Sequence, residues 1–581
     1  MLFAKTTLAS THQPTRFQLA ASSSKRFCGI FFRPSSKTKL MAGASLLALL
    51  PAFSLAANTS YKVSQIAVAG ATQGTFAQGI NKNNVVVGIA TLANGNTEGF
   101  ALVSGKYTIL KEPKASGTTR AFGVNDSNEV VGDFLGKDGY YHGFTLIGGK
   151  YAQYDVALGS ESTSIFGLNN AGDFAGTSGS EGYVNIGGTV TEFYGSGTDA
   201  TYPNAINNSN QVVGQYQDSS GNWHGFSRVA SSGTITEIAY PGALQTACVG
   251  INDSGVITGW YENSAQQFYG FIDTNGSFQT VDFLYANGIN NAGTFVGTYI
   301  GPGAAGGVTY GYMATPHAMK SFSTVAVPKA ESTNIYGLNN SGILVGSYTN
   351  SAGVNHGMMA TSTKITNIDD PSAVAGSTLC NGINTAGTIV GQYLNSSNFN
   401  FGFMYSGGVF TDISPAGAIY AEAVNINDSG VIAGTYTDSS GLTHAFTYSG
   451  GSYTSIDVPG ASASEAWGIN ASGEVTIDWV DANGYFESSV YNGSTFTTVN
   501  VPGALQTAAH SINASGNLVF TWYDYYGNLH GATMQGGVYY VFDAPGSDSA
   551  RADGINDTNL IVGRFPQTAN PSLYDGFRAT N

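Results

Sequence analysis

The sequence predicts an all-β protein, built as a β-propeller from twelve four-stranded blade repeats. The motif [GA]-[IVL]-N-x-x-[GN], followed by an apolar strand, recurs roughly every 43 residues, and a period of this length is typical of repeat folds. The 581 residues include 78 Gly, 33 Tyr and 32 Phe, which indicates short strands joined by tight turns. Charged residues make up only 10% and hydrophobic residues 42%. These values exclude a helical bundle and general disorder.

Residues 1–57 differ from the rest and are predicted to be a leader. They contain seven basic residues and no acidic residue, and end in an apolar run closed by small side chains. This is the layout of a secretory signal peptide, with cleavage expected after Ala56 or Ala57. A retained hydrophobic helix and an organelle transit peptide are the alternatives. The remaining chain has 15 basic and 37 acidic residues, a net charge of -22, which argues against nucleic-acid binding. It has no apolar run approaching the ~20 residues of a membrane span.

The Asn of the motif occurs in all twelve copies. Three residues later stands Gly in eight copies and Asn in four, and both residues tolerate a left-handed backbone. This pattern predicts that the motif Asn opens a type I hairpin turn with a bulge, and a structural role is favoured over ligand binding. The twelve predicted turn residues are Asn81, Asn125, Asn169, Asn207, Asn252, Asn290, Asn339, Asn384, Asn427, Asn470, Asn513 and Asn556.

Each repeat divides into four strands, as repeat nine illustrates. Strand A ends at the motif Ile-Asn, and strand B has the sequence VIAGTY. A D-S-S-G hairpin leads to strand C (THAFTY), and a Gly-Gly turn leads to strand D (YTSIDV). Four strands in about 40–45 residues are typical of a propeller blade. A solenoid is the alternative.

The chain ends indicate how the repeats close. The first strand after the leader, Tyr61–Val68, resembles strand D, and the last, YDGFRAT, resembles strand C. The N-terminal strand could therefore complete the C-terminal blade in one ring, but propellers usually have 4–8 blades. A second break lies near Pro316, where the Gly-Gly turn is missing and KSFSTVAV follows as a D strand. We therefore favour two six-bladed rings, residues 58–316 and 317–581, over one large ring.

The repeats G-I-N-[DN]-x-G-x-[IV]-[VA]-G and H-[GA]-F resemble the HAF-repeat family of bacterial extracellular proteins. The resemblance extends from about Tyr61 to Thr580 and implies a secreted or surface propeller-like protein of undefined activity. Repeats ten and eleven depart from the pattern, because Ile477 and Phe520 replace the strand-B Gly. These two blades are expected to pack differently.

No residue pattern predicts a catalytic, cofactor or metal site. Five histidines occupy one equivalent position in different repeats, which separates them around a ring and argues against a metal centre; they are His142, His224, His356, His444 and His530. The D-S-S-G turns carry one carboxylate each, so hairpin turns are favoured and only weak Ca²⁺ binding is left open. Cys248 and Cys380 are expected in the core rather than in a disulfide. The Gly-rich residues 301–306 open no helix, so phosphate binding is not expected.

These observations predict a secreted, extracellular or periplasmic scaffold. We expect a monomer that binds an unknown extracellular ligand, such as a glycan or a surface partner, rather than an enzyme. A hydrolase or lyase with axial carboxylates is one alternative; its candidates lie in the diverged repeats ten and eleven: Glu474, Asp478, Asp481 and Asp524. A structural envelope protein is the other.

Overall fold

The computed structural model describes residues 60–156, 162–195, 200–281, 283, 285–301, 308–482 and 484–581. The predicted leader with Ala56 and Ala57, and most of the Gly-rich 301–306 stretch, lie outside these residues. Regular structure in the described residues consists of 48 β-strands, nearly all in four-stranded antiparallel sheets. The predicted all-β propeller class is confirmed. None of these ranges contains a helix that is long and apolar enough to cross a membrane.

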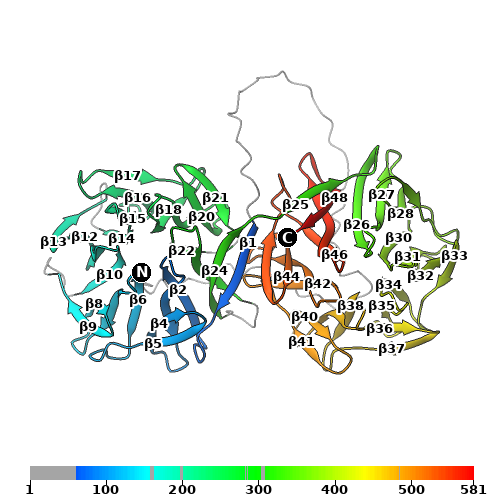
Figure 1. Ribbon diagram of the computed structural model, residues 1–581, viewed down its shortest axis with the longest axis horizontal. Helices are drawn as coiled ribbons and strands as arrows, with labels where there is room; N and C mark the ends of the chain where they lie inside the picture. Colours follow the sequence, from blue (N-terminus) through cyan, green and yellow to red (C-terminus); the bar gives the residue numbers. More distant parts are fainter. Residues whose placement is uncertain are drawn as a thin grey trace, which may run out of the picture.

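Strands β1–β24 form the blades of ring 1, numbered 1–6 (Figure 1). Blade 1 consists of β2 (Gly74–Ile80), β3 (Val86–Thr91), β4 (Thr97–Val103) and β5 (Lys106–Leu110). Blade 2 consists of β6 (Thr119–Val124), β7 (Val130–Leu135), β8 (Tyr141–Ile147) and β9 (Lys150–Tyr154). Blade 3 consists of β10 (Thr163–Leu168), β11 (Phe174–Ser178), β12 (Glu181–Ile186) and β13 (Thr189–Phe193). Blade 4 consists of β14 (Ala200–Ile206), β15 (Gln211–Gln217), β16 (Trp223–Val229) and β17 (Ile235–Ile238). Blade 5 consists of β18 (Gln245–Ile251), β19 (Ile257–Glu262), β20 (Phe268–Thr274) and β21 (Ser277–Val281). Blade 6 consists of β22 (Tyr285–Ile289), β23 (Phe295–Ile300), β24 (Thr309–His317) and the N-terminal β1 (Ser60–Ile66).

Strands β25–β48 form the blades of ring 2, numbered 7–12. Blade 7 consists of β26 (Ala330–Leu338), β27 (Leu344–Asn350), β28 (Asn355–Ala360) and β29 (Ile365–Asn367). Blade 8 consists of β30 (Leu379–Ile383), β31 (Ile389–Leu394), β32 (Asn400–Ser406) and β33 (Val409–Asp412). Blade 9 consists of β34 (Tyr420–Ile426), β35 (Ile432–Thr437), β36 (Thr443–Ser449) and β37 (Ser452–Ser455). Blade 10 consists of β38 (Ala463–Ile469), β39 (Val475–Val480), β40 (Phe486–Tyr491) and β41 (Phe496–Thr498). Blade 11 consists of β42 (Gln506–Ile512), β43 (Leu518–Tyr523), β44 (Leu529–Gln535) and β45 (Val538–Phe542). Blade 12 consists of β46 (Arg551–Ile555), β47 (Leu560–Gln567), β48 (Asn570–Thr580) and β25 (Ser321–Val325).

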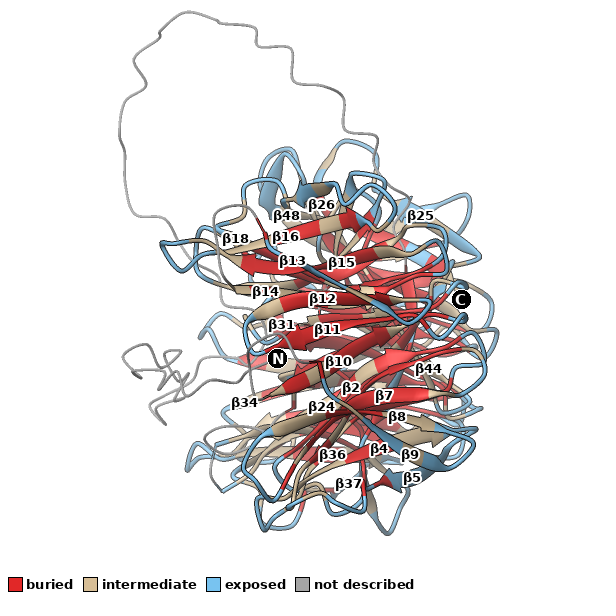
Figure 2. Ribbon diagram, turned by 90° about the vertical axis from the view of Figure 1, so that its left-hand side faces the viewer, coloured by how far each residue is buried: buried red, intermediate tan, exposed pale blue. Residues whose placement is uncertain are grey.

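The innermost strands of each ring contact one another in a closed cycle. In ring 1, β2, β6, β10, β14, β18 and β22 follow in order, and β22 contacts β2 again. In ring 2 the cycle runs through β26, β30, β34, β38, β42 and β46 back to β26. Burial decreases outward: the inner β2 is almost wholly buried, whereas four of the five residues of the outer β5 are exposed. Figure 2 shows this as buried strands inside and exposed hairpins at the periphery.

The core of a blade depends on complementary pairs across strands B and C. In ten blades a Gly on strand B lies opposite a large side chain on strand C, as Gly88 lies opposite Phe100. A Cβ on Gly88 would lie 2.0 Å from the Phe76 carbonyl oxygen, so no larger residue fits. Blades 10 and 11 exchange the two sizes, because Ile477 lies opposite Ser489 and Phe520 opposite Ala532. Core volume is thereby kept although the motif changes.

The N-terminal strand closes ring 1. All seven residues of β1 pair with β24, from Ser60 opposite His317 to Ile66 opposite Gly311. The N-terminal strand therefore does not complete the C-terminal blade, as it would in one large ring; the strand predicted from KSFSTVAV takes that place. The C-terminal β48 instead pairs with β25, which begins only a few residues after β24 ends. The short connection carries the chain from one ring directly into the other. As a result β1 is the outer strand of blade 6 in ring 1, and β25 is the outer strand of blade 12 in ring 2.

The two rings are joined edge to edge. The free edge of β1 pairs with β45, with Tyr61 opposite Val541 and Val63 opposite Tyr539, so blades 6 and 11 form one eight-stranded sheet. Figure 1 shows β1 between the two rings. One hydrophobic cluster includes buried side chains from both blades. Further along the junction, the backbone N–H of Phe268 in ring 1 donates to the Tyr526 hydroxyl in ring 2 over 2.5 Å.

Candidate functional site

The motif Asn of each blade lies in the hairpin that connects strands A and B. Asn81 shows the arrangement: its Oδ1 accepts hydrogen bonds from the backbone N–H groups of Asn83 and Val85, both at 3.0 Å. The residue three positions after the motif Asn has a left-handed backbone, with φ of 57° at Asn84 and 83° at Gly172. Side-chain oxygen and backbone together make a local turn that only an Asx residue followed by Gly or Asn adopts readily.

The same amide also connects neighbouring blades. Its Nδ2 donates to the backbone carbonyl of the motif Asn in the next blade, and the sixth Asn of each ring donates to the first. In ring 1 the cycle runs through Asn81, Asn125, Asn169, Asn207, Asn252, Asn290 and back to Asn81. In ring 2 it runs through Asn339, Asn384, Asn427, Asn470, Asn513, Asn556 and back to Asn339. These amides are buried and already hydrogen-bonded at both the oxygen and the nitrogen, which argues against a role in ligand binding.

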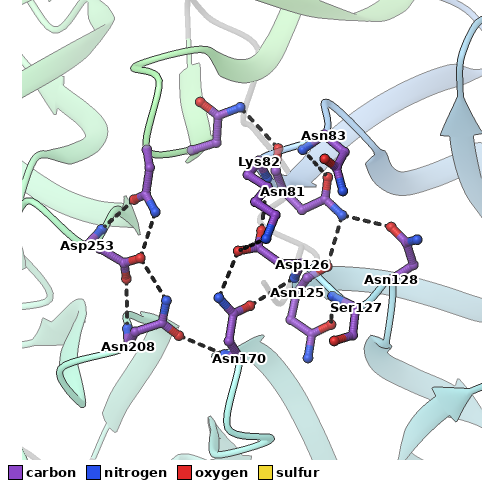
Figure 3. Close-up of polar contacts among 12 residues, drawn as sticks. Asn81, Lys82, Asn83, Asn125, Asp126, Ser127, Asn128, Asn170, Asn208 and Asp253 are labelled. Atoms are coloured by element: carbon purple, nitrogen blue, oxygen red, sulfur yellow. Dashed lines mark hydrogen bonds and ion pairs between the residues drawn. The ribbon is translucent and has the colours of Figure 1, made fainter.

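The residue after each motif Asn in ring 1 faces the opening at the ring axis. These six residues define what we call the axial mouth of ring 1: Lys82, Asp126, Asn170, Asn208, Asp253 and Asn291. They surround a cavity of about 80 Å³, with the Asn cycle and a layer of aliphatic side chains, such as Ile80 and Leu168, beneath them. Figure 3 shows side chains of the mouth and of the adjacent turns, drawn toward one another by hydrogen bonds.

Hydrogen bonds link the neighbouring residues of the axial mouth, and all of them run in the same direction around the axis. The backbone N–H of each residue donates to the side-chain oxygen of the next, from Lys82 to Asp126 at 3.0 Å up to Asp253 to Asn291 at 2.8 Å. The series stops between Asn291 and Lys82, because a lysine side chain has no acceptor atom. The mouth is therefore a preformed circle of polar groups with one cationic position, where the Lys82 side chain is 58% exposed.

Two carboxylates provide the acceptors of the axial mouth. The Asp126 Oδ2 accepts from the Asn170 amide at 2.8 Å and lies 3.5 Å from the Lys82 ammonium. The Asp253 Oδ2 accepts from Asn208 at 2.7 Å and from Asn291 at 2.6 Å. Partial burial favours the protonated acid, but the bonds from Asn208 and Asn291 outweigh it and lower the pKa of Asp253. This side chain is thus ionised at neutral pH and, with three bonds already accepted, keeps one lone pair on Oδ1 for a ligand.

The equivalent positions of ring 2 have a different chemistry. They are Asn340, Thr385, Asp428, Ala471, Ala514 and Asp557. The two alanines leave part of the circle without side-chain polar groups, although Thr385 still donates its N–H to Asp428 at 2.7 Å. The complete polar circle is thus a property of ring 1. Because the turns themselves are the same in both rings, the difference lies in the variable residue alone.

The five equivalent histidines bind carboxylates within their own blades. His444 contacts Asp457 through Nδ1 at 2.8 Å and Asp438 through Nε2 at 3.4 Å, and it stacks on Tyr436. Burial opposes the charged form, but the hydrogen bonds to both aspartates outweigh it and raise the pKa of His444. These contacts tie strand C to the end of strand D and to the B–C hairpin. Among the described residues, no group of three or more His, Cys, Asp or Glu side chains could hold a metal ion.

The carboxylates considered for catalysis do not meet at the axis. Asp524 and Asp481 lie in outer B–C hairpins, where their Oδ1 atoms accept backbone N–H groups such as that of Asn528 at 2.8 Å. Glu474 accepts from the Asn470 amide at 2.7 Å, and Asp478 is buried inside β39. Asp218 and Asp438 make the same Asx turns as Asp524.

Both cysteines of the described residues are free and fully buried. Cys248 lies on β18 of ring 1 and Cys380 on β30 of ring 2. Burial raises the pKa of both thiols, so they are neutral core side chains.

No family model and no curated protein matches the chain. Similar solved structures include PorZ, a surface component of the type-IX secretion system of Porphyromonas gingivalis, at 10% identity and a TM-score of 0.27, covering 86% of this chain and 79% of that one. The SapL1 lectin has 14% identity and a TM-score of 0.29, covering 41% and 89%. TolB from Acinetobacter baumannii has 12% identity and a TM-score of 0.30, covering 57% and 79%. Similarities at this level leave the ligand unassigned.

Proposed function

We propose that the protein is a secreted binding scaffold of the HAF-repeat type and that its ligand enters the axial mouth of ring 1. The predicted leader, cleaved after Ala56 or Ala57, would direct the export. The observation that carries the proposal is the complete circle of six polar side chains around an open axis, which ring 2 interrupts with Ala471 and Ala514. A purely structural role would not require polar side chains at all six positions, because each ring already has an Asn cycle that connects its own blades.

The chemistry of the axial mouth fits a neutral, hydroxyl-rich ligand such as the terminal sugar of a glycan. Each sugar hydroxyl both donates and accepts a hydrogen bond. Asp126 and Asp253 accept, Lys82 donates, and the asparagine amides do both. A polyanionic glycan is disfavoured, because the chain without the leader carries a net charge of -22. The cavity of about 80 Å³ admits part of one sugar ring rather than a whole oligosaccharide.

The test is a glycan array probed with the mature chain, followed by calorimetric titration of the strongest neutral glycan. Asp253→Asn removes an ionised acceptor without changing size and should weaken binding at least ~10-fold, about 1.4 kcal/mol. The matched control is Asp428→Asn, at the equivalent position of ring 2, which should bind like the wild type. The proposal fails if no neutral glycan binds, or if the two variants weaken binding equally.

A further inference from the structure

Blade 10 of ring 2 contains two carboxyl groups directly opposite each other, one buried and one half-buried. Glu465 on β38 pairs in register with Asp478 on β39. The Asp478 side chain is 1% exposed; its Oδ1 accepts from the Ser488 hydroxyl and from the backbone N–H of Ala509, at 3.1 Å in the second case. Its Oδ2 has no hydrogen-bond partner. A buried carboxylate oxygen without a partner costs far more free energy than the same oxygen in a neutral, protonated carboxyl.

Two other blades with charges at this register position compensate them, whereas blade 9 has a single carboxyl there, Glu422 opposite Thr435. In blade 2, Arg120 lies opposite Asp133, and the two groups form paired contacts of 2.7 and 2.6 Å. In blade 12, Arg551 lies opposite Arg564, and both contact Asp553. Blade 10 instead sets acid against acid, and the described residues provide no ion pair to either carboxyl. The negative charge of these two carboxyl groups is neutralised only when they bind protons.

Among the described residues no ion pair joins a cation to either carboxyl, although the charge of Arg551 on β46 favours the ionised form of Asp478. The groups that titrate or are charged near neutral pH on the packed strands are Glu422 on β34, His444 on β36, Glu487 on β40 and His510 on β42. Glu422 adds further negative charge next to Glu465. His444 is bound by its own aspartates. Burial and the charge of Arg551 lower the pKa of His510, so it is neutral. Arg551 itself is ion-paired with Asp553 at 2.9 Å.

Protonation of the pair follows from this environment. Burial outweighs the hydrogen bonds from Ser488 and Ala509 and the positive charge of Arg551, and it raises the pKa of Asp478 to about 7. Burial, together with Glu422 and Asp478, also raises the pKa of Glu465, whose side chain is half-buried. In the unfolded chain both groups titrate near pH 4. The folded chain therefore binds protons that the unfolded chain has released between about pH 4 and 8, and folding stability falls as the pH rises through this window.

We propose that the Glu465–Asp478 pair is a proton-dependent lock on ring 2. Bound protons keep blade 10 packed between blades 9 and 11 at acidic pH. Removing them places two adjacent negative charges inside the blade and loosens it. In the described part of ring 1 no two carboxyl groups face each other at this register position, and the matching Asp133 is held by Arg120. The lock is independent of ligand binding at the axial mouth.

The experiment follows the mature chain from pH 5 to 9 by thermal unfolding, hydrogen exchange and carboxyl infrared absorption. The melting temperature should fall by roughly 5 °C across this range, and exchange should increase in β38 and β39 before it does in ring 1. Glu465→Gln removes one of the two charges and should flatten the fall. Glu331→Gln, at an exposed position of ring 2, is the matched control and should retain it.

The infrared band of protonated carboxyl groups should be present at pH 6 and reduced in Asp478→Asn. This readout is independent of how stable the variants are. The proposal is overturned if Glu465→Gln shows the same pH dependence as the control, or if the folded wild type has no protonated carboxyl band at pH 6.

Discussion

At the scale of single residues, one amide performs two tasks in every blade. The turn formed by the motif Asn could be predicted from sequence, because it depends on neighbours two to four positions away. The bond from its Nδ2 to the next blade could not be predicted, since it joins residues such as Asn427 and Asn470 that are 43 positions apart and meet only when the ring closes. The invariant Asn therefore predicts the turn within its own blade, but not the hydrogen bond to the next blade.

Replacing Asn427 by Ala should destabilise ring 2. The change removes the acceptor for the N–H groups of Ser429 and Val431, at 3.1 and 2.9 Å, and the donor to the Asn470 carbonyl at 3.0 Å. Because buried polar groups lose their partners, we expect a loss of about 2–4 kcal/mol in the free energy of unfolding, measured by denaturant titration. Ser429→Ala, exposed in the same turn, should change stability little. An equal loss in both variants would show that the Asn bonds contribute nothing specific.

At the scale of elements, the sequence pattern predicts that a segment is an outer strand, but it does not predict which blade the strand joins. Tyr61–Val68 has the pattern of an outer strand, which fits any blade that lacks one. Its partner is decided by chain connection, because β24 and β25 follow each other so closely that β1 and β25 must divide the two open blades between them. Likewise, the sequence of strand B alone does not explain why Ile477 and Phe520 replace the usual Gly. The reason becomes clear only from the residues opposite, Ser489 and Ala532.

Proline at Val63 tests whether β1 is a closing strand. Val63 pairs with Ala314 on one side and with Tyr539 on the other, so both edges of β1 are used. Val63→Pro removes a backbone donor and should cost about 3 kcal/mol or more, with increased hydrogen exchange in β24 and β45. Thr108→Pro lies in the outer β5, paired on one side only, and should cost clearly less. If the two variants lose the same stability, β1 is an ordinary outer strand.

At the scale of the molecule, repetition explains why the fold was predictable and the site was not. Twelve copies constrain every structural position, so the propeller class follows from the residues that recur. The axial mouth is made of the residue that varies, from Lys82 to Asn291, and its position beside the constant Asn gives no signal until the six copies surround one axis. The two rings differ at these axial positions, because Ala471 and Ala514 in ring 2 stand where ring 1 has polar side chains. This difference separates the mouth of ring 1 from a feature that the fold alone requires.

The eight-stranded sheet and the contacts beside it predict that the two rings unfold together. Calorimetry of the mature chain should give one transition, with equal calorimetric and van't Hoff enthalpies. Tyr526 contributes to the coupling, because its hydroxyl accepts from the Phe268 N–H and its ring lies 5.0 Å from that of Tyr269. Tyr526→Ala should reduce the coupling by about 1–2 kcal/mol, so that the transition broadens and the van't Hoff enthalpy falls below the calorimetric one. Tyr525→Ala, a neighbouring side chain that is 37% exposed, should leave one sharp transition. Two separate transitions in the wild type would show that the shared sheet does not couple the rings. An unchanged enthalpy ratio in Tyr526→Ala would show that the Tyr526 contacts do not contribute to the coupling.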